Sequence, residues 1–208
     1  MSDASTTRLV LIRHGEVESR YQKVFGGRID MELSPRGHEQ ARQVADYLRL
    51  ARFDALYVSP LKRARQTVVP IADAVGLEPK VIPDLREVDF GVWTGLTWDE
   101  VRARHGVNAY DWLRELDRGG IPEAEPVEPY LARVRSAVDQ VRGRHPGQTV
   151  AVVCHGGVIR AILGILLSLP LPTTAHFEVD YASVSVVDCR SHRVEVQLLN
   201  FTPWLRLP

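Results

Sequence analysis

Residues 9–16 read LVLIRHGE, a short apolar run that leads straight into an arginine and a histidine. Residues 150–157 read VAVVCHGG, a second apolar run that also ends at a histidine. Runs of this length and composition predict core strands of an α/β sheet. Ligands of such sheets bind at the carboxyl ends of the strands. We therefore expect His14 and His155 at one edge of the sheet, beside a ligand.

The charge of that ligand is indicated by the arginine next to the first histidine. A guanidinium at Arg13 and two imidazoles that converge on one point would form a good receptor for a phosphate. Lys plus Arg and Asp plus Glu both number 26 among the 208 residues. No overall field therefore favours nucleic acid or an anionic membrane as a partner, and any positive potential must be local. A small phosphorylated metabolite is the expected partner.

Length and composition predict one domain over residues 1–208, large enough for a substantial core. The most apolar stretch, residues 161–167, is much shorter than the ~20 residues of a membrane span. Residues 1–5 lack the basic start of a signal peptide. Cys154 and Cys189 have no paired spacing, as expected in a reducing compartment. We therefore expect a cytoplasmic protein.

Strand and helix patterns alternate along most of the chain, which predicts an α/β fold with a mostly parallel sheet. Ser34-Pro35 and Ser59-Pro60 both match a helix start, with a cap residue followed by a first-turn proline. The tail, residues 177–201, alternates like two antiparallel strands joined near residues 191–192. Residues 93–129 are expected as an insertion over the sheet edge. The remaining strands are expected at 9–12, 55–58, 80–82 and 150–154, with helices at 35–48, 61–75, 97–105, 129–144 and after 157.

Hydrolysis of a phosphate monoester needs cationic donors, a nucleophile and an acid for the leaving oxygen. Expected strand ends and helix starts supply all three, with the candidates Arg13, His14, Arg63, Glu87 and His155. A metal centre is the chemical rival, because the two histidines and the glutamate could be ligands. Fixed positive charge at the two arginines would repel a cation, and no His-x-x-x-His or Cys-x-x-Cys spacing is present. We therefore expect no metal and no other cofactor.

Five motifs in order resemble the histidine phosphatase superfamily, in the branch that includes cofactor-dependent phosphoglycerate mutases and α-ribazole phosphatases. The resemblance extends from about residue 8 to residue 201. The motifs are RHGE at 13–16, LSPRG at 33–37, SPLKRA at 59–64, LRE at 85–87 with FG at 90–91, and HGG at 155–157. An isolated Arg-His-Gly would be weak evidence, whereas all five in order are specific.

The resemblance implies a three-layer α/β/α fold of the phosphoglycerate mutase type. It also implies that His14 is the nucleophile and becomes a phosphohistidine, and that Glu87 donates a proton to the leaving oxygen. Arg13, Arg63 and His155 would bind the transferred group. From chemistry, His14 must attack as neutral imidazole, its other nitrogen held by a backbone carbonyl. His155 would serve best protonated, a form that a bound phosphate dianion favours.

Further substrate contacts are expected from Gly27 at the mouth of the site and from Gly156. Many family members carry an asparagine where this chain has Arg20, so its guanidinium either replaces that amide or takes no part. The family's Gly-Gly-Glu-Ser stretch is here EAEP at 123–126, which leaves substrate contacts from that loop open. Three tryptophans and Tyr110 lie in the insertion, either packed on the core or facing the substrate.

A metal-independent phosphatase of small phosphomonoesters is the expected function. A phosphoglycerate mutase is the alternative, although mutases of the family tend to be longer and more extensively covered. A non-catalytic phosphate-binding module is the second alternative, and it would not need the nucleophile and the acid. The family acts on sugar phosphates, α-ribazole phosphate, phosphoglycerates and phosphoproteins, and the sequence selects none of these. It leaves the oligomeric state open too.

Overall fold

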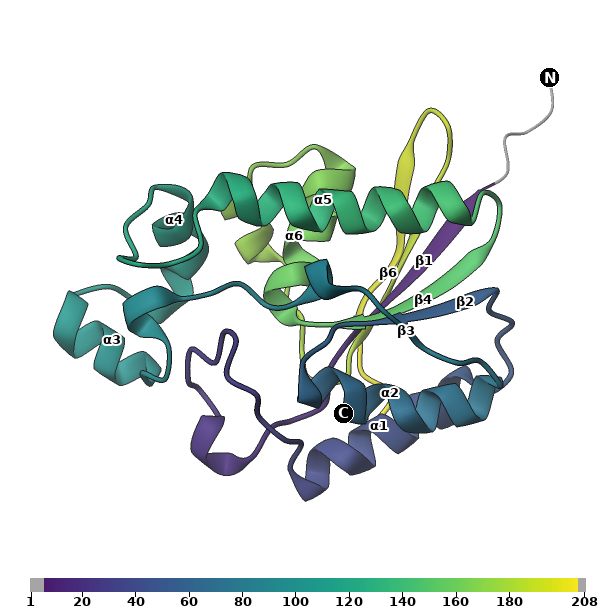
Figure 1. The fold of residues 1–208 in the computed structure, drawn as a ribbon, viewed down its shortest axis with the longest axis horizontal. Helices are drawn as coiled ribbons and strands as arrows, with labels where there is room; N and C mark the ends of the chain where they lie inside the picture. The colour runs from purple at the N-terminus through teal and green to yellow at the C-terminus, as the bar shows by residue number, and fades with distance from the viewer. Residues whose placement is uncertain (1–5, 206–208) are drawn as a thin grey trace.

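The computed structural model describes residues 6–205. Its centre is a mixed sheet of six strands with helices on both faces (Figure 1). The strands are β1 (Thr7–Arg13), β2 (Ala55–Val58), β3 (Lys80–Val81), β4 (Thr149–Cys154), β5 (Val184–Cys189) and β6 (Val194–Phe201). The helices are α1 (Pro35–Leu48), α2 (Lys62–Val75), α3 (Trp98–His105), α4 (Trp112–Asp117), α5 (Val127–Arg144) and α6 (Gly156–Leu167). Short 3-10 helices are η1 (Ser19–Tyr21), η2 (Pro83–Leu85), η3 (Gly91–Trp93), η4 (Ala109–Asp111) and η5 (Leu171–His176).

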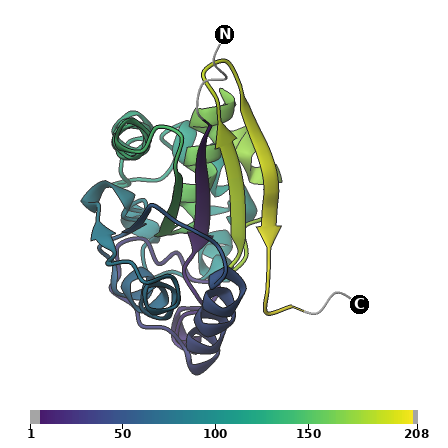
Figure 2. The same cartoon turned by 90° about the vertical axis from the view of Figure 1, so that its right-hand side faces the viewer.

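The strand order β3-β2-β4-β1-β5-β6 brings the two histidine-bearing strands together at the centre. Strands β1 to β4 pair in parallel, whereas β5 runs antiparallel to β1 and β6 antiparallel to β5. Arg13 lies opposite Cys154, and Val58 lies opposite Val153. The segments that leave β1, β2 and β4 therefore emerge side by side. The predicted antiparallel tail is confirmed, and β6 forms the outer edge of the sheet (Figure 2).

Alternation along β1 divides the core into two layers. Leu9 and Leu11 are buried with residues of α5 and α6 on one face of the sheet. Val10 and Ile12 are buried with residues of α1 and α2 on the other face. Figure 1 shows the two helix pairs above and below the sheet. This arrangement confirms the predicted α/β/α fold.

The two Ser-Pro motifs differ in whether their serine caps the helix that follows. The Ser34 oxygen accepts a hydrogen bond from the Gly37 amide at 3.0 Å, so α1 is capped as predicted. The same expectation for Ser59 is wrong, because α2 begins after Leu61 without a side-chain cap. The hydroxyl of Ser59 instead contacts His155 in the site described below.

The segment 93–129 lies beyond the carboxyl ends of the parallel strands (Figure 1). Thr97 and Glu100 form a capping box at the start of α3, where the sequence predicts a helix. Helix α4 was not expected, because six residues are too few to show a helical period. Helix α5 begins at Val127, two residues before the predicted start. Within residues 6–205, no helix has both the length and the apolar character required to cross a bilayer.

Candidate active site

A cavity of about 230 Å³ opens at the carboxyl ends of the parallel strands. Its wall brings together candidates that are far apart in sequence. Arg13 and His14 come from the end of β1, Arg63 from the first turn of α2, and Glu87 from the segment after η2. Gly27 and Gly156, both expected at the substrate, also line the cavity. His155 lies immediately behind this wall, with its ring centroid 5.2 Å from that of His14.

The tautomer of His14 is determined by its two neighbours. Its Nδ1 lies 2.8 Å from the carbonyl oxygen of Gly15, which can only accept, so Nδ1 carries the hydrogen. Its Nε2 lies 3.2 Å from the Nε–H of Arg63 and accepts from it. Burial, and then the positive charges of Arg63 and Arg13, hold the pKa of His14 well below 6.5. His14 is therefore a neutral imidazole whose unprotonated nitrogen is Nε2, as expected for a nucleophile.

Arg63 is buried, with only 2% of its surface exposed, and its guanidinium is held in place by backbone carbonyls. Its two terminal nitrogens donate to the carbonyl oxygens of Ile29 and Gly27, each at 2.8 Å. Burial lowers its pKa to about 10, so the guanidinium remains charged at neutral pH. These carbonyls fix its orientation, which leaves Nε directed at Nε2 of His14.

Arg13 lies on the other side of His14. One terminal nitrogen donates to the carbonyl of Val179 at 2.6 Å, and the guanidinium carbon lies 4.0 Å from the ring centroid of Tyr181. Its Nε is buried and has no hydrogen-bond partner within residues 6–205. A buried donor without a partner costs free energy, so this group is available for an anion in the cavity.

His155 is completely buried, and only one of its ring nitrogens has a partner in the described part of the chain. Nε2 lies 2.6 Å from the Ser59 hydroxyl, whereas Nδ1 has none. Burial, followed by the charge of Arg63, holds the pKa of His155 well below 6.5. The ring is therefore neutral in the free protein, and its expected protonated form requires a phosphate dianion to be present.

Glu87 is oriented by backbone amides. Its carboxylate accepts from the amide of Val88 at 3.0 Å and from that of Gly157 at 3.1 Å. Gly157 lies in the first turn of α6, where free amides favour negative charge. A Cβ at Gly157 would lie 2.5 Å from an oxygen of Glu87 and 3.2 Å from Trp112. Only glycine allows the carboxylate to approach this closely.

The structure does not bring Arg20 to this site. Its guanidinium is exposed, pairs with Glu18 at 3.1 Å and lies over the ring of Tyr21. Two charged residues that the sequence analysis missed, Arg160 and Glu178, do line the cavity. Arg160 follows Gly156 by one helical turn, which is the signal that could have identified it.

The aromatic residues of the insertion divide between the two expected roles. Trp93 is 1% exposed and belongs to the core, where it packs against Phe25. Trp98, Tyr110 and Trp112 line the cavity. The stretch 123–126, whose substrate contacts the sequence left open, does not line the cavity, and its Glu125 pairs with Arg133 of α5. Among residues 6–205, no group of three or more His, Cys, Asp or Glu could hold a metal ion.

Comparison with known proteins gives the family and the type of reaction. The model of the histidine phosphatase superfamily (branch 1) matches residues 9–202. Phosphoserine phosphatase 1 of Hydrogenobacter thermophilus is 34% identical over 195 residues, which cover 94% of this chain and 92% of that protein. Adenosylcobalamin/alpha-ribazole phosphatase of Escherichia coli is 27% identical over 193 residues, which cover 93% and 95% of the two chains.

Solved structures show the same fold. A mycobacterial glucosyl-3-phosphoglycerate phosphatase has a TM-score of 0.84 at 27% identity, covering 94% of this chain and 99% of that one. The phosphoserine phosphatase of Entamoeba histolytica, solved with 3-phosphoglyceric acid, has a TM-score of 0.80 at 28% identity, with 94% and 98% covered. The chain is a phosphatase and belongs to branch 1 of the histidine phosphatase superfamily.

Proposed function

We propose that this enzyme hydrolyses a small phosphorylated metabolite through a covalent phosphohistidine at His14, with Glu87 as acid and then base. The observation that carries the proposal is the fixed tautomer of His14, whose Nε2 lone pair is free of hydrogen and lies beside Arg63. A cavity of about 230 Å³ suits a small substrate. Two of the similar proteins above are named for small phosphorylated compounds, phosphoserine and glucosyl-3-phosphoglycerate.

In the first step, Nε2 of His14 attacks phosphorus, and the bond from phosphorus to the ester oxygen breaks. Glu87, which is protonated in the substrate complex because the negative phosphate lies beside it, transfers its proton to that leaving oxygen, and the alcohol departs. Arg13 and Arg63 supply fixed positive charge to the equatorial oxygens during the transfer. His155 takes up a proton from solvent as the dianion binds, adds a further donor through Nδ1, and returns that proton to solvent when phosphate leaves.

In the second step, water attacks the phosphohistidine. Glu87, now a carboxylate, takes a proton from this water while the oxygen binds phosphorus and the N–P bond breaks. His14 returns to the neutral form and inorganic phosphate leaves. The proton gained by Glu87 restores the state in which the cycle began.

Rapid-quench labelling tests the nucleophile. With an aryl phosphate labelled in the phosphoryl group, the wild type should carry acid-labile label on protein, and His14→Ala should carry none. Turnover should fall by at least about 1,000-fold in this variant, while its circular dichroism stays unchanged. A His14→Ala protein that still carries the label would overturn the proposal.

The role of Glu87 is tested by the leaving group. Glu87→Gln should hydrolyse an alkyl phosphate about 100- to 10,000-fold more slowly, because an alkoxide needs a proton. An aryl phosphate has a better leaving group and should lose far less. Equal losses on the two substrates would exclude Glu87 as the acid. A wild-type enzyme that interconverts 2- and 3-phosphoglycerate faster than it hydrolyses either would be a mutase.

A further inference from the structure

Tyr181 is an aromatic residue of the cavity wall that has no task in the proposed reaction. Its ring centroid lies 4.0 Å from the guanidinium carbon of Arg13 and 5.6 Å from the ring centroid of His14. The ring therefore touches both the proposed nucleophile and an arginine expected to bind the transferred group. Through one of these neighbours, Tyr181 can act on the reaction without contacting the substrate itself.

The backbone next to Tyr181 is tied to the end of β1. The amide of Ala182 donates to the carbonyl oxygen of His14 at 3.0 Å. The amide of Arg13 in turn donates to the carbonyl oxygen of Ser183 at 3.1 Å. Ala182 is completely buried and has a φ of 51°, a left-handed conformation that an alanine keeps only where its surroundings impose it. The turn that carries Tyr181 is thus fixed against the two residues that the ring contacts.

The same turn is anchored from its other side by the end of the chain that follows β5. The indole nitrogen of Trp204 donates to the carbonyl oxygen of Tyr181 at 2.9 Å. The side chain of Asn200 accepts from the amide of Asp180 at 2.6 Å and donates to the carboxylate of Asp180 at 2.9 Å. Because these contacts involve no ligand, the ring of Tyr181 is a fixed surface already in the free protein.

Arg13 depends on such a surface more than Arg63 does. Two carbonyl oxygens and His14 fix the guanidinium of Arg63, whereas that of Arg13 donates to the carbonyl of Val179. Nε of Arg13 is buried and has no partner among residues 6–205. One hydrogen bond does not determine the plane of a guanidinium. Cation–π attraction holds that plane against an aromatic face and leaves the N–H groups free for an anion.

We propose that Tyr181 is a positioning residue, whose ring face holds the guanidinium of Arg13 so that Nε remains directed at the transferred phosphoryl group. The inference rests on the proposed function, in which Arg13 stabilises the charge on that group. A donor that is already oriented stabilises the transition state without further ordering. The role belongs to the ring and not to the hydroxyl, because the contact with Arg13 is made by the aromatic face.

Two substitutions separate the ring from the hydroxyl. Tyr181→Leu removes the aromatic face and should lower kcat/KM for an aryl phosphate by about 10- to 100-fold, the size of effect that a misplaced active-site group has. Tyr181→Phe keeps the face and should remain within about threefold of the wild type. Tyr47→Leu makes the same change at a half-exposed tyrosine of α1 and is the matched control, which should keep the wild-type value.

A double-mutant cycle tests whether Tyr181 acts through Arg13. Binding of inorganic phosphate, followed by titration calorimetry, is a readout that needs no turnover. Tyr181→Leu should raise the dissociation constant of phosphate by about 3- to 10-fold, the cost of ordering one long side chain on binding. In an Arg13→Met background, the same change should alter it by less than about twofold, because the side chain to be ordered is gone.

Three results would overturn the proposal. Equal losses in Tyr181→Phe and Tyr181→Leu would assign the role to the hydroxyl. Equal effects of Tyr181→Leu with and without Arg13 would mean that the ring acts elsewhere, for example on His14. Wild-type kinetics in Tyr181→Leu would show that Arg13 needs no support.

Circular dichroism and Tm identify a variant that has lost its fold, and Tyr181→Met, with a flexible side chain of similar length, then replaces Tyr181→Leu throughout the cycle. A wild type that carries no label on His14 would refute the proposed function instead. The phosphate-binding cycle would still decide the role of Tyr181 in that case, because it measures binding and not phosphoryl transfer.

Discussion

At the scale of single residues, the site keeps two histidines neutral beside three arginines. His14 and His155 are both buried, and the nearby guanidiniums disfavour a further positive charge. In the proposed reaction, the neutral form of His14 is the reactive one. For His155 the neutral form would be a resting form, which a bound phosphate dianion would convert to the cation. The same surroundings thus suit the two imidazoles to different tasks.

This neutrality predicts how the free enzyme responds to acid. The pKa values of His14 and His155 lie below 6.5 in the folded protein and near 6.5 in the unfolded chain. Below pH 6.5 the unfolded chain therefore binds more protons than the folded protein does. Stability should be constant above that pH and fall below it, by at most about 1.4 kcal/mol per pH unit for each histidine. Urea unfolding between about pH 5 and 7.5 measures the slope.

His14→Asn is the informative variant for this experiment, because it removes one of the two titrating groups. Its slope below pH 6.5 should be about half that of the wild type. The carboxylates with lowered pKa values, Glu100, Glu125 and Asp188, act mainly below this range. An unchanged slope in His14→Asn would contradict the neutral state assigned to this ring.

Ser59 gives a second prediction at this scale. Its hydroxyl lies 2.6 Å from Nε2 of His155 and fixes the ring, while Nδ1 has no partner within residues 6–205 and is free for the donor role proposed above. Ser59→Ala should lower kcat by about 10- to 100-fold, because a small misplacement of a catalytic group has effects of this size. Steady-state kinetics with an aryl phosphate measure the loss, and Ser59→Thr should retain more activity. Wild-type kcat in Ser59→Ala would show that the ring needs no such support.

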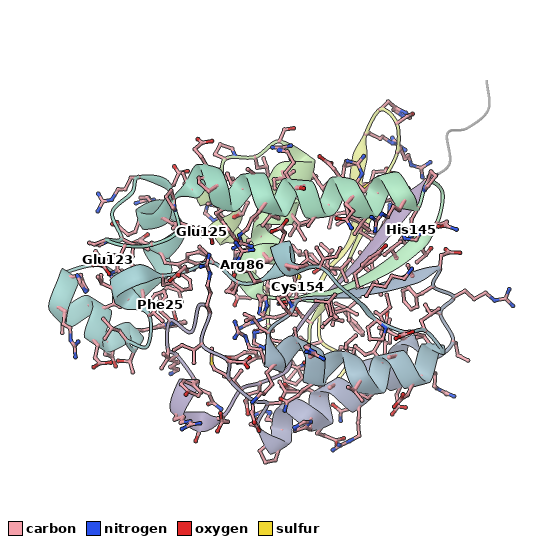
Figure 3. All side chains as sticks on the ribbon, viewed as in Figure 1. Phe25, Arg86, Glu123, Glu125, His145 and Cys154 are labelled. Carbon is pink, nitrogen blue, oxygen red and sulfur yellow. The ribbon has the colours of Figure 1, made fainter. Side chains whose placement is uncertain are left out.

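At the scale of elements, the segment that carries Glu87 is tied to α5. Arg133, 8% exposed, donates to the carbonyl oxygens of Asp84 and Arg86 at 2.7 Å and of Glu87 at 3.2 Å. Glu125 pairs with the same guanidinium at 2.6 and 2.7 Å. Figure 3 labels Glu125 and Arg86, which lie beneath α5 in that view. One arginine of α5 thus holds the end of η2 and the residue that follows it, Glu87, through three backbone carbonyls.

Arg133→Lys keeps the positive charge but removes the planar guanidinium that donates to three carbonyl oxygens. The change should therefore displace Glu87 without unfolding the protein. We expect kcat for an alkyl phosphate to fall by about 10-fold or more, with a smaller loss for an aryl phosphate. Arg135→Lys, at an exposed position of the same helix, should lose on neither substrate. Equal losses on the two substrates in Arg133→Lys would mean that Arg133 does not act through Glu87.

The elements themselves were largely predictable because their signals are local. Leu9 to Ile12, the capping serine of α1 and the glycine after α2 each act within a few positions of the chain. The role of Ser59 could not be assigned in this way, because the residue that its hydroxyl contacts, His155, lies 96 positions away in the sequence. Arg133 was missed for the same reason: its role depends on a loop that only the folded chain brings near.

At the scale of the whole molecule, a chain of zero net charge concentrates positive charge in one place. β1, α2 and α6 each contribute one guanidinium to the cavity, from Arg13, Arg63 and Arg160. Their mutual repulsion is a cost that the fold bears in the absence of ligand. An anion that binds only the folded state should therefore stabilise the protein as a whole.

Inorganic phosphate, the expected product, tests this argument without catalysis. At 100 times its dissociation constant, a ligand of the folded state adds about 2.7 kcal/mol. For a chain of this size, that corresponds to a rise in Tm of about 5–10 °C. Sodium chloride at equal ionic strength screens the repulsion but fits no receptor, so it should give a much smaller rise. Arg63→Met should lose most of the response to phosphate, whereas Arg65→Met, two positions along the same helix and exposed, should keep it. Equal responses in the two variants would mean that phosphate stabilises the protein from elsewhere on its surface, and that the cluster at the sheet edge is not its receptor.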